Sequence, residues 1–273
     1  MRYIFFDIDG TLLSHEEGIS PSTIEALNLL KEKGHKIFIC TGRSYAEVPE
    51  TIYKFNFDGV IAAAGGYVKY QDEIIYNKIL PDHMVDNLVY FLNKFDIPFV
   101  LEGETMVYTR KDAIYAGHEN LERLREKKEK TKYEFSAIDF IIPRKHSIEE
   151  YFENRTNINK LTVYADSYEQ LVELERVIDK DYYIIKYETA GELLVKGINK
   201  FTGIEKMLKH LDVSVEDTIA IGDSLNDYDM VESCKIGIAM GNSSQPLKDI
   251  ADYITTDVDD DGIYNAMKHF ELI

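Results

Sequence analysis

Two carboxylates close an apolar run near the start of the chain, in the segment FFDIDGT, where Asp7 and Asp9 stand one residue apart. A carboxylate can attack phosphorus and form an aspartyl phosphate. A second carboxylate two residues later, on a sharp turn that Gly10 permits, can point past the first toward a leaving oxygen and act as a general acid. These residue types at this spacing could therefore carry out phosphoryl transfer.

The segments around this motif alternate between strands and helices. RYIFFD predicts a buried strand, and SPSTIEALNLLKEKG predicts a helix with Ser20 or Ser22 as its cap and Gly34 at its end. KIFIC predicts a second buried strand, a helix is expected over residues 45–54, and GVIAAAGG returns to a short strand and a glycine-rich turn. This β-α-β-α-β order predicts a parallel sheet covered by helices.

The last part of the chain repeats this alternation. A helix over about residues 201–211 precedes the strand TIAIGD, a second helix follows through NDYDMVESC, and KIGIAM predicts another strand before a further helix and a short strand. The acids of DVDDDG, residues 257–262, are expected at a helix N-terminus, where negative charge is favoured. Both ends of the chain are therefore expected to form one α/β core with a Rossmann-like parallel sheet.

The middle of the chain follows no repeating βαβ order. FVLEGETMVYT and YYIIKYETAGELLV each predict a hairpin, and amphipathic helices accompany them. We therefore expect an inserted α+β cap domain over residues 82–189, within a core of residues 1–81 and 190–273. The segment RLREKKEKTK, residues 123–132, carries six basic and two acidic residues; we expect a solvated helix face or loop there, with a positive patch as the alternative.

Three predicted strands end in residues that could take part in chemistry. Asp7 and Asp9 follow the first strand, Thr41 and Gly42 follow the second, and Asp223, Asn226 and Asp227 follow the third. Because ligands of open parallel sheets bind beyond the carboxyl ends of the strands, we expect these side chains to face one crevice. Two carboxylates 4 Å apart repel each other by about 4 kcal/mol near a protein surface, so four of them need protons or a cation. A donor set made only of oxygen suits Mg2+, which also binds substrate phosphate.

A transferring phosphoryl group also needs hydrogen-bond donors and positive charge around its oxygens. The residues that can supply them are Thr41, Gly42 through its backbone amide, Asn226, and Lys200, which opens a predicted helix. The sequence therefore predicts a phosphate-binding group beside the acidic residues.

Other ligand-binding motifs are excluded or disfavoured. D-x-D-G also opens a calcium loop, but Thr11 and Gly18 stand where that loop requires an Asp or Asn and a Glu. The sequence contains neither G-x-x-x-x-G-K-[ST] nor G-x-G-x-x-G, which disfavours a nucleotide P-loop or a dinucleotide fold.

Charge and composition limit the classes of partner that we expect for this chain. A net charge of -18 repels phosphate backbones, so we expect no nucleic-acid partner. Cys40 and Cys234 match no metal or redox spacing and are expected to be buried thiols in a reducing compartment. The N-terminus lacks the apolar region of a signal peptide, and no stretch approaches the roughly 18 apolar residues of a membrane span. We therefore expect a cytoplasmic protein with no membrane partner.

With these motifs in place, the chain resembles the haloacid dehalogenase (HAD) superfamily, and within it the Cof-type phosphatases with a large α+β cap between the second and third motifs. The resemblance covers nearly the whole chain and rests on DIDGT, TGR, KGINKFTG and GDSLNDYDM in that order, and on the ending IGIAMGNSSQPLKDIADYITTDVDDDGI. It implies Mg2+-dependent hydrolysis of small phosphomonoesters, such as sugar phosphates or the cofactors pyridoxal phosphate and FMN, through an aspartyl phosphate.

By this resemblance, Asp7 is the nucleophile, and Asp9 is the acid that protonates the leaving alcohol and then the base that activates water. The resemblance also implies that Asp7, the backbone carbonyl of Asp9, and Asp223 hold the metal, with Asp227 supporting the metal shell and Lys200. Thr41, Lys200 and Asn226 are implied to bind the phosphate.

Two positions depart from the family pattern. The loop after the third strand commonly carries an Asn-Gly pair, whereas Ala64 stands at the Asn position, so we expect a polar contact to the cap or substrate to be missing. Phe201 follows Lys200 where the family often has Gly, which changes the packing expected there.

The motifs leave two alternatives open. A sugar phosphomutase of the same superfamily shares them and returns the phosphoryl group to a sugar. A non-catalytic regulator that binds a phosphate ligand is disfavoured because all the motif residues are intact. In each case the partner is a small phosphorylated metabolite, and the sequence specifies neither that metabolite, nor the cap residues that contact it, nor the oligomeric state.

Overall fold

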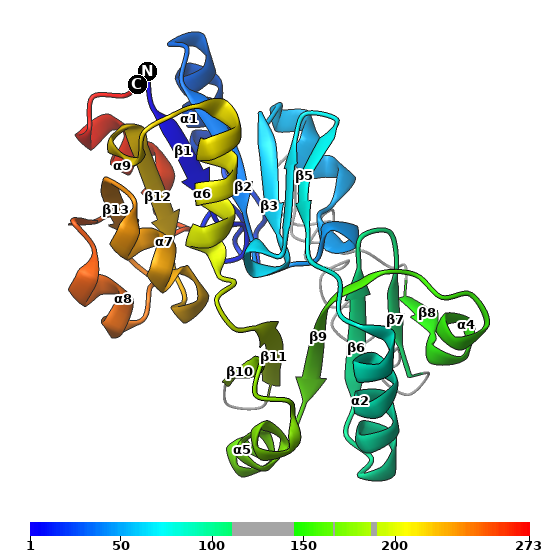
Figure 1. The fold of residues 1–273 in the computed structure, drawn as a ribbon. Helices are drawn as coiled ribbons and strands as arrows, with labels where there is room; N and C mark the ends of the chain where they lie inside the picture. Colours follow the sequence, from blue (N-terminus) through cyan, green and yellow to red (C-terminus); the bar gives the residue numbers. More distant parts are fainter. Residues whose placement is uncertain (111–144, 166, 187–189) are drawn as a thin grey trace.

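The computed structural model describes residues 1–110, 145–165, 167–186 and 190–273. Two β-sheets organise these residues, and Figure 1 shows them in two separate parts of the molecule. The chain passes from the first sheet to the second and then returns to complete the first. The predicted α/β class, a Rossmann-like parallel sheet with an α+β insertion, is confirmed.

The first sheet has eight strands in the order β14-β13-β12-β1-β2-β3-β4-β5. They are β1 (Tyr3–Phe6), β2 (Lys36–Cys40), β3 (Gly59–Ala62), β4 (Tyr67–Tyr70), β5 (Glu73–Asn77), β12 (Thr218–Gly222), β13 (Ile236–Ala239) and β14 (Tyr253–Ile254). Strands β14 to β3 pair in parallel, and β4 and β5 extend the sheet antiparallel. Because β1 lies between β12 and β2, the carboxyl ends of these three strands are neighbours on one edge.

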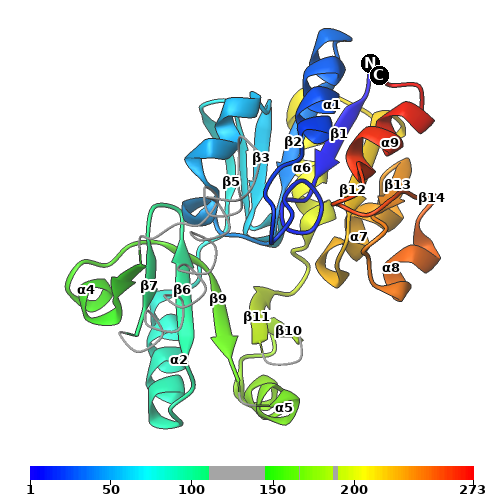
Figure 2. The same cartoon turned by 180° about the vertical axis from the view of Figure 1, so that it is seen from behind.

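Helices cover both faces of the first sheet (Figures 1 and 2). The helices α1 (Pro21–Glu32) and α9 (Gly262–His269) pack on one face, and α6 (Lys200–Leu211), α7 (Tyr228–Ser233) and α8 (Gln245–Ile250) pack on the other. Strand β1 serves both layers, since Ile4 and Phe6 join the core under α1 while Phe5 joins the core under α6. Burial on both faces explains why these strands are continuous apolar runs.

The ends of α1 follow the predicted signals. The hydroxyl of Ser20 accepts the backbone N–H of Thr23 at 3.2 Å, and Pro21 occupies the first turn. After the helix, Gly34 has a φ of +80°, a conformation that favours glycine. Ser20 is therefore the cap.

The single helix predicted over residues 45–54 is wrong. The chain forms two short 3-10 helices there, η1 (Tyr45–Glu47) and η2 (Glu50–Phe55). Pro49 separates them because it has no backbone N–H and because it disfavours a helical conformation at Val48, whose ψ is 114°. A continuous helix cannot pass this position.

The second sheet has six strands in the order β10-β11-β9-β6-β7-β8. They are β6 (Phe99–Gly103), β7 (Val107–Thr109), β8 (Lys145–Ser147), β9 (Ile158–Tyr164), β10 (Tyr182–Lys186) and β11 (Ala190–Val195), and the helices α2 (Asp82–Lys94), α4 (Ile148–Glu153) and α5 (Tyr168–Val177) accompany them. Both predicted hairpins are confirmed, since β6 pairs antiparallel with β7 and β10 with β11. A separate apolar core joins α2 and α5 to this sheet.

The predicted domain limits stay a prediction, and one of them cuts through the second sheet. Strand β11 begins at Ala190 and pairs with β9 and β10, so residues that the prediction gives to the core share hydrogen bonds with the insertion. The basic segment over residues 123–132 lies outside the described residues.

The helices that the structure describes are short. The longest of them, α2, has 13 residues. None of these helices is long and apolar enough to cross a membrane.

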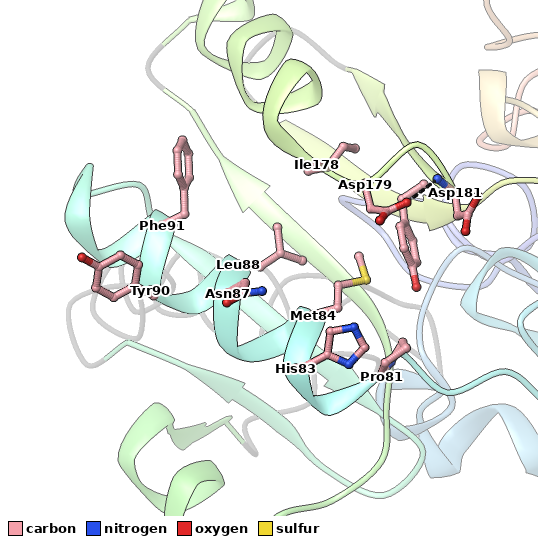
Figure 3. A pocket seen from close by; sticks show the side chains of 11 residues that line it. Pro81, His83, Met84, Asn87, Leu88, Tyr90, Phe91, Ile178, Asp179 and Asp181 are labelled. Atoms are coloured by element: carbon pink, nitrogen blue, oxygen red, sulfur yellow. Dashed lines mark hydrogen bonds between the residues drawn. The ribbon is translucent and has the colours of Figure 1, made fainter.

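A groove of about 690 Å³ lies between α2 and the segment that leads from α5 into β10 (Figure 3). The apolar residues that line it include Met84, Leu88, Phe91 and Ile178. None of the predicted site residues lines this groove, so the acidic residues and the groove are separate features.

Candidate active site

Three carboxylates meet at the carboxyl edge of the first sheet. Asp7 follows β1 and Asp223 follows β12, and these strands pair in parallel with Phe6 opposite Ile221. The backbone N–H of Asp7 donates to the carbonyl of Ile221 at 3.0 Å, which continues the pairing to the strand ends. One carboxylate oxygen each from Asp7, Asp223 and Asp227 lies within 4.8 Å of the others. The structure thus brings together three of the four carboxylates that the sequence predicts to cluster.

Gly10 lets the loop after β1 approach Asp223 closely. Its φ is +80°, and a Cβ atom at this position would overlap the carboxylate of Asp223. The hydroxyl of Thr11 donates to Oδ1 of Asp223 at 3.2 Å, and the side-chain amide of Asn242 donates to the carbonyl of Gly10 at 2.8 Å. Asn242 was not among the predicted site residues, although it follows β13 as the other polar residues follow their strands.

Lys200 is fully buried between two of the carboxylates. It is the first residue of α6, whose N-cap Asn199 accepts the backbone N–H of Thr202 at 2.8 Å. Its Nζ bonds Oδ1 of Asp7 at 2.7 Å and also bonds Oδ1 of Asp227. The ammonium group therefore neutralises part of the buried negative charge.

The other oxygen of Asp227 holds the turn after β12. Oδ2 of Asp227 accepts the backbone N–H groups of Asp223 and Ser224, each at 3.0 Å. Both carboxylate oxygens of Asp227 are therefore occupied, one by Lys200 and the other by the backbone of the turn.

One lysine does not balance the acidic residues. Burial raises the pKa of Asp7 well above its usual range, Lys200 opposes this, and the charges of Asp227 and Asp223 add to it. Burial and the nearby Asp227 raise the pKa of Asp223 to about 7, although Lys200 lowers it. Carboxyls that resist ionisation in this way mark a site that a cation would stabilise.

The donors at this position fit Mg2+. Asp7 and Asp223 offer carboxylate oxygens, the backbone carbonyl of Asp9 follows on the same loop, and Asp227 is close enough to support them. All of these donors are oxygen atoms, as Mg2+ prefers. The residues of this chain could therefore hold such a cation.

Asp9 turns away from the other carboxylates toward Arg43. Nε of Arg43 donates to Oδ2 of Asp9 at 2.7 Å, and Nη2 donates to Oδ1 at 2.6 Å, which is a bidentate ion pair. Burial alone would raise the pKa of Asp9, but Arg43 outweighs burial and lowers it. Arg43 was not among the predicted site residues, because nothing in the motif TGR tells which way the arginine points.

The predicted phosphate-binding residues also lie at this edge. Thr41 follows β2 and is buried, and its hydroxyl accepts the backbone N–H of Arg43 at 3.1 Å. Gly42 comes next, and a Cβ atom built there would lie 2.9 Å from Nδ2 of Asn226. Gly42 therefore leaves room for the side chain of Asn226 beside the loop.

Two residues of the second sheet reach the same loop. Nζ of Lys160 on β9 donates to the carbonyl of Gly42 at 2.8 Å, and it bonds Oε1 of Glu192 on β11 at 2.8 Å. The sequence offered no signal for either residue, because their proximity depends on strand order in the second sheet.

The two departures from the family pattern have structural counterparts. Ala64 is buried and left-handed, with a φ of 50° and a ψ of 39°, a conformation that favours Asn or Gly. Its backbone N–H still donates to the carbonyl of Thr41 at 3.1 Å. Phe201 packs against the apolar core beneath α6, which accommodates the larger side chain.

The sequence from residue 4 to residue 267 matches the family model of haloacid dehalogenase-like hydrolases. The chain therefore belongs to this family. It is an enzyme of the class that hydrolyses phosphoric monoesters, as its relatives indicate.

Two relatives from Bacillus subtilis (strain 168) align over the whole chain. YkrA, named as an unconfirmed phosphatase, is 29% identical over 100% of this chain and 98% of its own length. The 5-amino-6-(5-phospho-D-ribitylamino)uracil phosphatase YcsE is 27% identical over 100% of this chain and 96% of its own length.

The chain is also similar to solved structures of phosphatases of the haloacid dehalogenase superfamily. The structure reported for the HAD subclass IIB sugar phosphatase BT4131 is 31% identical, has a TM-score of 0.80, and covers 100% of both chains. That of BT1666 from Bacteroides thetaiotaomicron, described among phosphatases of the superfamily, is 28% identical with a TM-score of 0.81 over 100% of this chain and 96% of its own.

Proposed function

We propose that the protein is a Mg2+-dependent phosphatase that hydrolyses small phosphomonoesters through an aspartyl phosphate on Asp7. The observation that carries this proposal is the place of Asp7, at the end of the central strand with Lys200 2.7 Å from one oxygen and Asp223 beside it. A carboxylate held rigidly beside positive charge is suited to attack a phosphorus atom.

The reaction has two steps. First, a carboxylate oxygen of Asp7 forms a bond to phosphorus as the bond to the leaving oxygen breaks, and Asp9 gives a proton to that oxygen. Second, Asp9 takes a proton from water, the water oxygen bonds phosphorus, and the bond to Asp7 breaks. Inorganic phosphate leaves, and both carboxylates return to their starting states.

Arg43 determines the protonation state of Asp9 between substrates. The bidentate pair favours the ionised form, which is the form that activates water. Donation of a proton to the leaving oxygen requires the pair to open, since a carboxylate that accepts two charged hydrogen bonds holds a proton poorly.

The remaining residues bind and orient. Thr41, the backbone amide of Gly42, Asn226 and Lys200 are the proposed donors to the phosphate oxygens. Asp7, the carbonyl of Asp9, and Asp223 would hold Mg2+, and Asp227 would orient Lys200. The metal, when bound, supplies positive charge that offsets the carboxylates and the phosphoryl oxygens.

We propose the second sheet and its helices as the cap that encloses the substrate. The proposed division is a core of residues 1–81 and 190–273 and a cap of residues 82–189, with β11 completing the cap sheet. Sugar phosphates or phosphorylated cofactors are the proposed substrates. The names of YcsE and BT4131 support this class, since each refers to a phosphorylated small molecule or a sugar.

Hydrolysis of an aryl phosphate tests the proposal. We expect Mg2+-dependent turnover that Asp7→Asn abolishes, while Asp249→Asn, on an exposed acid far along the chain, retains it. We expect Asp9→Asn to slow both formation and breakdown of the aspartyl phosphate. Turnover without Mg2+, or full activity in Asp7→Asn, would contradict the mechanism. Phosphate release from a panel of sugar phosphates separates hydrolysis from a mutase reaction, which yields an isomer and no phosphate.

A further inference from the structure

Four polar residues lie on one face of the second sheet. Glu102 on β6 stands opposite Lys160 on β9, and Glu192 on β11 stands opposite Thr162 on β9. Since Lys160 and Thr162 are two residues apart in a strand, they point to the same side of the sheet. We call Glu102, Lys160, Thr162 and Glu192 the polar face.

The other side of the same strands is apolar. Leu101, Leu161, Val163 and Leu193 alternate with the polar residues and join the core that α2 and α5 complete. The polar face therefore points away from that core. It meets the first sheet instead, because Lys160 donates to the carbonyl of Gly42.

Lys160 has its hydrogen-bond donors in use. Its side chain is 4% exposed, and its Nζ lies 2.8 Å from Gly42 O, 2.8 Å from Glu192 Oε1 and 3.4 Å from Glu102 Oε2. Burial would lower the pKa of Lys160, but Glu102 and Glu192 raise it above its usual range. The ammonium stays charged and already has its counter-charges.

Glu192 keeps an acceptor oxygen to spare, because its Oε2 is buried without a hydrogen-bond partner in the described part of the chain. Glu102 is already engaged. Its Oε1 accepts the hydroxyl of Thr162, its Oε2 lies 3.4 Å from Nζ of Lys160, and burial and the charge of Glu47 raise its pKa. A buried acceptor without a donor is costly unless a ligand supplies the donor.

The spare acceptor of Glu192 borders the loop at Gly42. A Cβ atom built on Gly42 would lie 3.7 and 3.8 Å from the two carboxylate oxygens of Glu192, and 2.9 Å from Nδ2 of Asn226. The side chains of Glu192 and of Asn226, a proposed donor to the phosphate, thus lie close to the same residue, Gly42. A substrate with its phosphate at Asp7 has to place its leaving group beside this face.

We propose that Glu192, Glu102 and Lys160 determine leaving-group specificity, and that they select a hydroxyl-bearing leaving group without a second negative charge. A hydroxyl group donates to the spare carboxylate oxygen of Glu192. A carboxylate or second phosphate would lose its hydration beside Glu192 and find no unpaired cation among Lys160, Lys200 and Arg43, each of which already holds a carboxylate. This inference rests on the proposed function.

Two pairs of substrates test the inference on the wild-type protein. Glycerol 3-phosphate and 3-phosphoglycerate differ at one carbon, a hydroxymethyl group against a carboxylate, and sorbitol 6-phosphate and 6-phosphogluconate differ in the same way over a longer chain. We expect kcat/KM to be at least about tenfold higher for the hydroxymethyl member of the pair whose length suits the site. Equal or better turnover of the carboxylate members in both pairs overturns the inference.

Hydrolysis of an aryl phosphate distinguishes failure of this inference from failure of the proposed function. Hydrolysis of the aryl phosphate without the expected preference overturns the specificity assignment alone. Failure to hydrolyse the aryl phosphate and both pairs overturns the proposed function and this inference together.

Glu192→Gln tests the residue itself, because it removes the charge and keeps the shape. We expect the ratio of kcat/KM between hydroxymethyl and carboxylate substrates to fall about tenfold toward unity. Glu173→Gln, an exposed glutamate on α5 that pairs with Arg176, is the matched control and should keep the wild-type ratio. If Glu192→Gln lowers kcat/KM equally for both kinds of substrate, Glu192 only bridges the two sheets and the inference fails. Should that variant not fold, the two substrate pairs decide the question.

Discussion

A buried lysine lies between two carboxylates in each half of this molecule. At the edge of the first sheet, Lys200 bonds Asp7 and Asp227. On the second sheet, Lys160 bonds Glu192 and lies 3.4 Å from Glu102. Both ammonium groups are almost completely inaccessible to solvent. The same arrangement of charges thus occurs twice, on two different kinds of sheet.

The two lysine sites differ in their balance of charge. The first includes Asp223, which shares the space with Asp7 and Asp227, and its excess of acid suits a metal ion. In the second, Lys160 lies beside both Glu192 and Glu102, and burial together with the charge of Glu47 raises the pKa of Glu102. Under our proposals, the first site would hold a cation and a transferring phosphoryl group, and the second would contact the leaving group through hydrogen bonds.

Removal of Lys200 is expected to have the largest effect. Lys200→Met leaves Asp7 and Asp227 buried without their counter-charge, which costs about 3 to 5 kcal/mol of unfolding free energy. It also removes positive charge beside the phosphoryl group, so kcat/KM for an aryl phosphate should fall about 10³-fold. Urea unfolding and steady-state kinetics measure the two effects.

Lys206→Met is the matched control for this variant. Lys206 lies on the same helix and donates to the carbonyl of Thr202, away from the carboxylates. It should change neither quantity appreciably. A Lys200→Met protein with wild-type stability would show that the acidic residues do not need their lysine.

Lys160→Met should lower the free energy of unfolding by less than Lys200→Met does. It leaves Glu192 and Glu102 without an ammonium partner, but burial and the charge of Glu47 already raise the pKa of Glu102 and ease its protonation once the ammonium is gone, so we expect a loss of about 2 to 3 kcal/mol. Urea unfolding gives the value, with Lys186→Met on β10 as a control. A loss equal to that of Lys200→Met would break the comparison, because it would show that the second site tolerates uncompensated acid no better than the first.

The two lysine sites should also differ in how their contribution to stability depends on pH, because the first includes Asp223. Its pKa of about 7 lies above the ordinary value near 3.8, so the folded state binds this proton more tightly than the unfolded state. The resulting stability is fully present below about pH 4 and is lost as the pH rises through 7. For the metal-free protein we expect this to amount to about 1 to 2 kcal/mol, since Asp223 is only partly buried.

The measurement is urea unfolding from pH 4 to 8, with and without Mg2+, on wild type, Asp223→Asn and Glu102→Gln. Mg2+ should stabilise the wild type more at high pH, and Asp223→Asn should flatten the metal-free profile. Glu102→Gln should keep the wild-type response to Mg2+. An equal loss of that response in Glu102→Gln would mean that the two sites are not independent.

The difference between the sites also explains how far the sequence could predict them. Asp7, Thr41 and Asp223 follow strands of one parallel sheet, and such strands end at the same edge, so a reading of strand ends places them together. Lys200 followed from its position at the start of a predicted helix. These positions depend on local patterns and on one topological rule.

The second site depends on register and strand order instead. Lys160 meets Glu102 and Glu192 only because β9 lies between β6 and β11, and a shift of one residue would turn it to the apolar side. Side-chain direction was equally unreadable for Arg43, which pairs with Asp9. The helix predicted over residues 45–54 does not form for a local reason, because Pro49 interrupts it.

The smallest predicted effect concerns the backbone around the two sites. Lys160 lies in a regular strand, whereas the loop that supports Thr41 holds Ala64 at a φ of 50°. Ala64→Gly should raise the unfolding free energy by about 0.5 to 1 kcal/mol, since glycine adopts this conformation without strain. Ala62→Gly, two residues earlier at a φ of -120° in β3, should lower it by a similar amount. Because the same substitution is made at both positions, opposite signs in urea unfolding would isolate the conformational strain, and equal losses would mean that Ala64 is tolerated at no cost.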